Sequence, residues 1–361
     1  MSDELGHLTN GAARARGAQS NAVGRFEPYA RIAVDDGWER DDEAPLLRTE
    51  VAEEVPRSVI TRNTSPDVNF DRSVNPYRGC EHGCVYCFAR PGHAWLGLSP
   101  GQDFETRLIA RPTAPAVLDK ELRKRGYAPA PIALGTYTDP YQPIEKDYRI
   151  MRDVLEVLRT FNHPVQIVTK GTLIERDIDI LADMAGKGLA SVGVSVTTLD
   201  PRIARVMEPR VPSPKRRVET IRRLAAAGIP VRVMASPLIP ALTDHELEAI
   251  LEAGQAAGAV AATAIPLRLP REVAELFTEW VEVHFPDRAR RILGRVREMH
   301  DGKIYDPAFG SRMTGSGIWA EQLQARLNIS RKKLCLNEKM PDLRCDLFAV
   351  PFAEGDQLGL F

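Results

Sequence analysis

Three cysteines in one short loop constrain this chain more than any other feature of its sequence. Cys80, Cys84 and Cys87 have the spacing C-x3-C-x2-C, which lets three thiolates converge on one small inorganic core. Gly79 and Gly83 allow the backbone to bend tightly between them. A structural zinc site and an iron–sulfur cluster that only carries electrons both use four protein ligands. Three thiolates on a four-iron cluster would leave one iron open to bind another molecule.

The same loop is also compatible with a structural zinc site. His82 or a distant cysteine could then supply the fourth ligand. Cys335 and Cys345 lie far along the chain and have no close cysteine neighbours. We therefore predict no second cluster from them.

The composition is typical of a soluble globular protein. Of 361 residues, 43% are hydrophobic and 27% are charged. No run of about 20 apolar residues predicts a membrane span, and residues 1–17 lack the apolar stretch of a signal peptide. Five cysteines form no disulfide framework, and an oxygen-sensitive cluster needs a reducing compartment. We predict a cytoplasmic protein.

The net charge of −1 conceals an uneven distribution of charge. Acidic residues gather before residue 55, and basic residues gather at 215–217, 222–223, 288–297 and 331–333. An acidic arm with a basic, anion-binding core is one interpretation. Solvated helix faces are the other, and the sequence does not separate the two.

The middle of the chain alternates between strand and helix patterns. Short apolar runs at 68–76, 131–136, 165–169, 189–196, 229–235 and 260–265 predict six strands, and helical spacing lies between them. Strands without polar alternation are covered on both faces, as in a parallel sheet. Six units are too few for a closed eight-stranded barrel, so we predict an α/β fold with a partial (β/α)6 barrel.

We divide the chain into four parts. Residues 1–60 are expected to be a largely disordered or loosely packed extension, and residues 65–300 to be the partial barrel. Residues 301–350 would be a C-terminal extension, and 351–361 a flexible tail.

The loop Asn75–Cys87, with Tyr86 just before the last cysteine, resembles that of the radical SAM superfamily. Residues 75–244 also resemble its spore photoproduct lyase-like branch, in the Asn-Pro-Tyr-x-Gly-Cys start, Thr138-Asp139, Thr169-Lys170 and Ser195. The resemblance implies a partial barrel of radical SAM type. It also implies a 4Fe-4S cluster on the three cysteines and reductive cleavage of S-adenosyl-L-methionine to a 5′-deoxyadenosyl radical.

Several residues at strand ends are candidates to bind this cofactor. The resemblance assigns Tyr86, Thr138, Asp139, Lys170 and Ser195 to it. Arg210 could bind a carboxylate, and Ser236 ends the fifth strand beside a candidate adenine slot. Some of them also have an ordinary explanation: Thr138-Asp139 as turn residues, Lys170 as a solvated cation, and Ser195 as a backbone-bonded hydroxyl.

One position departs from the lyase pattern. The lyase has a hydrogen-donating cysteine just before its Ser/Thr-Asp pair, where this chain has Tyr137. A tyrosine can also donate a hydrogen atom, so Tyr137 is a candidate catalytic residue, but the substitution puts identical chemistry in doubt.

The last five residues resemble the peptide by which bacterial repair and replication proteins bind the sliding clamp. Gln357, Leu358, Leu360 and Phe361 would supply its polar and apolar anchors. An ordinary apolar tail packing on its own domain is the alternative.

The leading prediction is a radical SAM enzyme that acts on nucleic acid, in lyase or photolyase-like DNA repair, with an external electron donor. A peptide, a tRNA or a small metabolite is the alternative substrate. A zinc-binding interaction module that docks on the sliding clamp is the alternative from another class.

Overall fold

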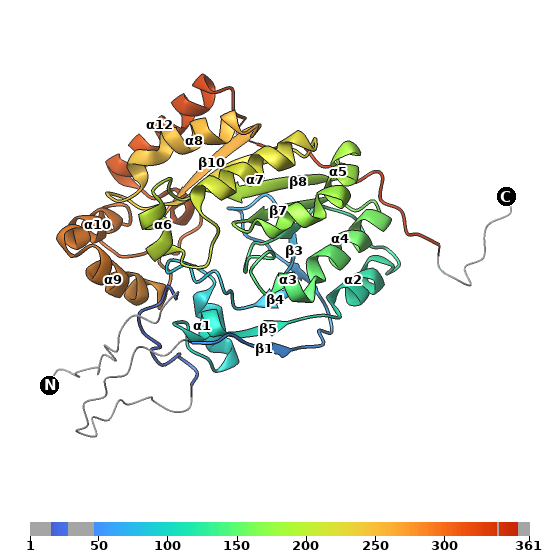
Figure 1. The fold of residues 1–361 in the computed structure, drawn as a ribbon, viewed down its shortest axis with the longest axis horizontal. Helices are drawn as coiled ribbons and strands as arrows, with labels where there is room; N and C mark the ends of the chain where they lie inside the picture. The colour runs from blue at the N-terminus through green and yellow to red at the C-terminus, as the bar shows by residue number, and fades with distance from the viewer. Residues whose placement is uncertain (1–15, 28–46, 338, 353–361) are drawn as a thin grey trace.

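A seven-stranded sheet forms the centre of the fold (Figure 1). The structure is a computed structural model that describes residues 16–27, 47–337 and 339–352. The strand order is β10-β9-β8-β7-β6-β3-β2. The strands are β2 (Ile60–Arg62), β3 (Arg72–Val74), β6 (Ile132–Leu134), β7 (Val165–Thr169), β8 (Ala190–Ser195), β9 (Val231–Leu238) and β10 (Ala261–Pro266).

Six of these strands are parallel, as the sequence predicted. Parallel pairing runs from β3 through β6, β7, β8 and β9 to β10. The prediction of a partial barrel is confirmed, because the sheet has two ends, at β10 and β2. The antiparallel edge strand β2 was not predicted. It is only three residues long and half-buried to exposed, so it has no apolar pattern to detect.

Helices cover the outer side of the sheet (Figure 1). The buried side chains of α4, α5, α7 and α8 join the strand side chains in one large core. The helices are α1 (Asp103–Thr106), α2 (Ala114–Leu122), α3 (Glu145–Tyr148), α4 (Ile150–Thr160), α5 (Ile178–Gly186), α6 (Pro201–Met207), α7 (Pro214–Ala226), α8 (Leu247–Ala256), α9 (Val273–His284), α10 (Pro286–Glu298), α11 (Ser311–Thr314) and α12 (Gly317–Lys333), with 3-10 turns at Arg90–Leu96, Leu173–Asp177 and Asp244–Glu246.

Two helix starts lack the side-chain caps that their residue types favour. Thr243 and Glu246 have the spacing of a capping box, but Thr243 Oγ1 accepts a hydrogen bond from the backbone N–H of Ile239. Glu246 instead accepts hydrogen bonds from Thr198 and Leu199. Ser213 stands at the N-cap position of α7 but makes no side-chain capping bond.

A second core lies beside the three-cysteine loop. Cys84 and Tyr86 pack in it with Phe277 and Trp280 of α9. The C-terminal helices therefore support the loop, although they follow the last strand of the sheet.

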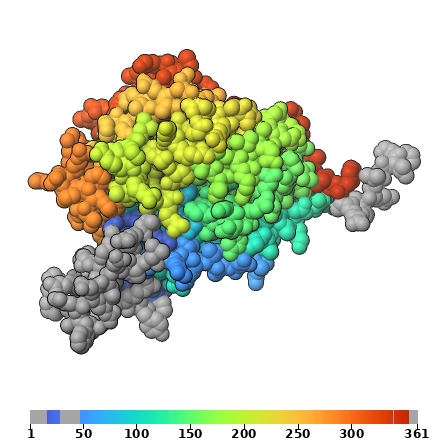
Figure 2. Space-filling model, viewed as in Figure 1, coloured from blue at the N-terminus to red at the C-terminus, as the bar shows by residue number. Residues whose placement is uncertain are grey.

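The described N-terminal residues pack more closely than we expected of a loose extension. Arg16 and Ala18 are buried, and β1 (Glu50–Glu53) pairs with β5 (Arg107–Ala110) in a small sheet completed by β4 (Tyr77–Arg78). In Figure 2 the dark-blue residues of this segment lie beside the orange surface of α9 and α10. The partner of Gly17 and Ala18, Glu105, lies 88 and 87 residues away, so no local sequence pattern shows this contact.

Among the residues that the structure describes, none of the helices combines the length and the apolar character needed to cross a membrane. The proposed clamp-binding residues, Gln357, Leu358, Leu360 and Phe361, lie outside the described residues.

Candidate active site

The three cysteines line one cavity of about 850 Å³. Cys80 and Cys84 are buried, Cys87 is half-buried, and all three are free thiols. Gly79 and Gly83 have positive φ angles of 74° and 68°, so the loop uses the left-handed backbone that glycine allows. The residue pattern and the structure therefore agree on where the three sulfur atoms gather.

The environment of the thiols fits a positively charged inorganic core. Burial raises the pKa of Cys80, Cys84 and Cys87, so thiolates here need a nearby cation to offset the loss of hydration. In the described part of the chain, no three His, Cys, Asp or Glu side chains lie close enough to bind a single metal ion. Three thiolates from one loop could each hold a different iron of a four-iron cluster.

His82, the other candidate ligand of the zinc alternative, faces a carboxylate. Its Nδ1 lies 3.3 Å from Oδ2 of Asp139, close enough for an ion pair but without hydrogen-bond geometry. Burial alone would raise the pKa of Asp139. The adjacent His82 ring and hydrogen bonds from Lys170 N and Thr169 Oγ1 outweigh burial and hold that pKa at about 2. Asp139 is therefore a charged acceptor at the cavity wall.

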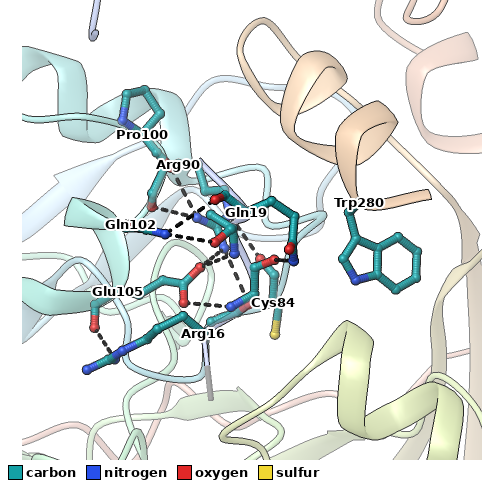
Figure 3. Close-up of polar contacts among 12 residues, drawn as sticks. Arg16, Gln19, Cys84, Arg90, Pro100, Gln102, Glu105 and Trp280 are labelled. Carbon is teal, nitrogen blue, oxygen red and sulfur yellow. Dashed lines mark hydrogen bonds and ion pairs between the residues drawn. The ribbon is translucent and has the colours of Figure 1, made fainter. Parts of the chain in front are cut away.

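A buried ion pair supports the back of the three-cysteine loop (Figure 3). Arg90 donates to the carbonyl oxygens of Gly83 and Cys84, at 3.3 and 3.0 Å. It pairs with Glu105 at 2.5 Å, and both side chains are fully buried. Arg90 thus fixes the backbone of the loop, and Glu105 supplies the opposing charge.

The N-terminal segment completes this support. The Glu105 carboxylate accepts hydrogen bonds from the backbone N–H groups of Gly17 and Ala18, both at 2.8 Å. A Cβ atom on Gly17 would lie 1.7 Å from the carbonyl oxygen of Gly83, so only glycine fits there. We call residues 16–27 the N-terminal strap, because Ser20 also donates to Glu279 of α9 at 2.8 Å.

A second buried network holds Tyr86. Its hydroxyl donates to Glu208, which also accepts a 2.8 Å bond from Arg217 of α7. Arg217 donates to the backbone carbonyl of Ser195 at 3.0 Å. The Lys170 Nζ lies 5.7 Å from the centre of the Tyr86 ring. Burial opposes the charge of Lys170, but nearby acidic groups, Glu208 among them, raise its pKa, so the amine enters the cavity as a cation.

Sequence reasoning missed Glu208 and Arg217 as site residues. Arg217 was counted among the basic residues at 215–217, whose role the sequence left open, but it is completely buried. The missed signal was its spacing: Arg217, Ile221 and Leu224 lie at helical intervals on one buried face of α7.

Most of the predicted cofactor residues meet at the cavity. It is lined by Tyr86, Tyr137, Asp139, Lys170, Ser195 and Ser236. The Ser236 hydroxyl is buried and has no hydrogen-bond partner among the described residues. An orphan hydroxyl at a strand end suits a polar ligand.

Thr138 and Arg210 do not line the cavity. The Thr138 hydroxyl donates to the carbonyl oxygen of Tyr77 at 2.9 Å. Arg210 pairs with Glu81 at 3.2 Å and donates its backbone N–H to His82. Both therefore brace the three-cysteine loop from outside, because a partner within the protein already engages each side chain.

Tyr137, the candidate hydrogen donor, lies on the cavity wall. It is 37% exposed, and its hydroxyl donates to the carbonyl oxygen of Ala89 at 3.3 Å. The ring thus reaches the segment that follows the last cysteine.

Cationic side chains outnumber carboxylates on the cavity wall. Among the described residues, five Lys or Arg residues line it, against one carboxylate, Asp139; the cations are Arg78, Arg111, Lys170, Arg268 and Arg312. Glu54 and Asp67, outside the lining, pair with three of the arginines. The carboxyl ends of β7, β8 and β9 supply Lys170, Ser195 and Ser236, as is usual for sites in parallel barrels. A ligand that fills the cavity is expected to be anionic.

Sequence comparisons found a family model and relatives that match this chain. The family model of the radical SAM superfamily matches residues 74–254. An uncharacterized protein of Mycobacterium tuberculosis is 38% identical over 240 residues, which cover 66% of this chain and 69% of that protein. An uncharacterized protein of Methanocaldococcus jannaschii is 27% identical over 173 residues, covering 48% and 62% respectively.

Solved structures of spore photoproduct lyase share the fold. The lyase in complex with a dinucleoside spore photoproduct aligns with a TM-score of 0.56 and 15% identity, covering 79% of both chains. A mutant of the lyase with bound AdoMet and the dinucleoside photoproduct also gives a TM-score of 0.56, at 13% identity.

Proposed function

This chain belongs to the radical SAM superfamily and is a radical SAM enzyme, and we propose that it abstracts hydrogen from a modified or damaged base of a nucleic acid. The superfamily implies a 4Fe-4S cluster and S-adenosylmethionine. When bound, this pair supplies a 5′-deoxyadenosyl radical. A photolyase-like repair reaction is the proposed use of that radical.

The proposal assigns roles to the residues that line the cavity. Cys80, Cys84 and Cys87 hold the cluster. Lys170 and Asp139 carry opposite charges, which suit the carboxylate and the ammonium group of S-adenosylmethionine. The buried hydroxyls of Ser195 and Ser236 suit its ribose or adenine edges.

The observation that carries the nucleic-acid substrate is the charge of the cavity. Beyond Lys170, four arginines line the same space as the three cysteines, and one of them, Arg268, forms no ion pair with a carboxylate of the described residues. Arginines bind phosphate oxygens through paired N–H groups, and phosphate contacts position proteins on nucleic acids. A large polyanion with one reactive base fits this arrangement better than a neutral metabolite does.

An anaerobic assay tests the function. The protein is purified without oxygen, iron and sulfide are measured, and dithionite and S-adenosylmethionine are added with and without damaged DNA. We expect 5′-deoxyadenosine from the wild type and none from Cys84→Ala. Cys335→Ala is the matched control, because Cys335 is an exposed thiol outside the cavity.

The outcomes separate the alternatives. Zinc in place of iron, together with no cleavage, would refute the radical reaction. Cleavage that DNA and RNA leave unchanged, with no altered nucleotide, would refute the substrate and favour a peptide or small metabolite.

A further inference from the structure

One arginine of the cavity forms no ion pair with any carboxylate of the described residues. Arg268 follows β10, and its two terminal nitrogens donate to the Met313 sulfur at 2.9 Å and to the Tyr305 hydroxyl at 3.4 Å. Its Nε atom is buried and has no hydrogen-bond partner within the described ranges. A guanidinium held in this way keeps its charge available for a ligand.

The other arginines of the cavity are already engaged. Arg111 and Arg78 share Glu54, at 3.2 and 3.5 Å. Arg312 pairs with Asp67, which also accepts a hydrogen bond from the backbone N–H of Gly310. The charge of Arg268 contributes to lowering the pKa of Asp67, but the Asp67 carboxylate is bonded to Arg312 and Gly310.

One aromatic ring lies beside this cation, and a second lines the same cavity. The guanidinium carbon of Arg268 lies 5.7 Å from the centre of the Phe88 ring. Phe88 directly follows Cys87 and is 46% exposed, and Trp95, on the same cavity, is 70% exposed. The Trp95 ring is braced by Phe26 of the N-terminal strap, with ring centres 4.5 Å apart. Large exposed rings at a cavity suit a planar ligand.

We infer that Phe88, Trp95 and Arg268 form a subsite for one nucleotide unit, with the base stacked on the rings and a phosphate on the guanidinium. Stacking on aromatic rings accepts any base, and an arginine beside the rings supplies the phosphate contact. Because Phe88 is next to Cys87, a base held there lies close to the three-cysteine loop. The inference rests on the proposed function and names the residues that would recognise the substrate.

Binding experiments test this subsite without relying on catalysis. The anisotropy of a fluorescent ten-nucleotide thymidine strand is measured with the full chain between 50 and 200 mM salt. For Arg268→Gln we expect about tenfold weaker binding and a dependence of log affinity on log salt that is shallower by about 0.7, the value for one phosphate of a single strand. Arg268→Lys should keep most of that salt dependence.

A second variant separates the ring from the charge. Phe88→Leu should weaken binding of the thymidine strand about tenfold and leave binding of an abasic strand of equal length unchanged. Arg344→Gln is the control, because Arg344 is exposed and pairs with Asp346 away from the cavity. Thermal unfolding of each variant shows that it is folded.

Two outcomes would overturn the proposed subsite. If Arg268→Gln binds the strand as the wild type does, with the same salt dependence, the subsite is refuted while the proposed function stands. If the wild type binds no strand at all but forms 5′-deoxyadenosine, the nucleic-acid substrate fails together with the subsite.

Discussion

The buried pair of Arg90 and Glu105 provides the sharpest test of how the three-cysteine loop is held. Glu105→Gln keeps the size of the side chain but replaces one carboxylate oxygen with an N–H donor. The two Glu105 oxygens now accept hydrogen bonds from the backbone N–H groups of Gly17 and Ala18 and from Arg90, at 2.5 to 2.8 Å. The new N–H donor would face Gly17 in one orientation of the amide, and Ala18 and Arg90 in the other. One buried donor then loses its acceptor, and Arg90 loses its opposing charge.

The expected cost is about 3 kcal/mol in the free energy of unfolding. An unsatisfied buried donor costs about 1–3 kcal/mol, and breaking a buried ion pair costs about 3–5 kcal/mol. The four carbonyl oxygens that also accept from Arg90 offset part of this cost. A loss of this size is a large fraction of the stability of a typical domain, which is about 5–15 kcal/mol.

Urea unfolding of the iron-free protein, followed by tryptophan fluorescence, measures the change, and iron content after reconstitution reports on the loop. Glu156→Gln is the control, since Glu156 forms an exposed pair with Arg159 and should change stability by less than about 0.5 kcal/mol. A loss below about 1 kcal/mol for Glu105→Gln, or full iron content despite a large loss, would refute the reasoning.

Three further predictions follow from other parts of the chain. Lys170→Gln should weaken S-adenosylmethionine binding about tenfold in equilibrium dialysis without changing iron content, because it removes one charged hydrogen-bond donor; unchanged affinity would show that Lys170 does not touch the cofactor. Burial lowers the pKa of His163 to about 4, so its unfolded form binds a proton first, and stability should fall by up to about 3 kcal/mol as the pH drops from 7 to 4. His163→Asn should show a shallower fall between these pH values, and an identical slope would contradict this. We also propose that residues 357–361 dock on the bacterial sliding clamp: their deletion should abolish clamp binding in surface plasmon resonance and leave 5′-deoxyadenosine formation intact, whereas retained binding would place the contact elsewhere.

Much of the fold could be predicted because its signals are local. The strand β7 was predicted with its observed bounds, and the other five parallel strands within a few residues, since each is a short apolar run between helical patterns. Six such units indicate an open barrel from their number alone. The short edge strand β2 could not be predicted, because its pairing with β3 rather than its composition creates it.

The site residues could be predicted where their partners are close in sequence, and not where the partners are distant. Cys80, Cys84 and Cys87 lie close together in sequence, so their spacing alone predicts that they meet. Glu105 was not predicted, because its partners Gly17 and Ala18 lie 88 and 87 residues away. Thr138 could not be told from its neighbour Asp139 either, since only the fold decides which of two adjacent side chains faces the cavity.

The N-terminal strap sets an order for assembly during synthesis. Residues 16–27 are made early, but Glu279 and His284, against which Ser20 and Gln19 lie, are made about 260 residues later. At a synthesis rate of about 5–20 residues per second, the strap lacks these partners for roughly 13 to 50 seconds. The contacts of the strap with Glu105 need only about 90 further residues, so the strap can reach the three-cysteine loop before α9 exists. The strap is therefore fixed in two stages, first against Glu105 and then against α9.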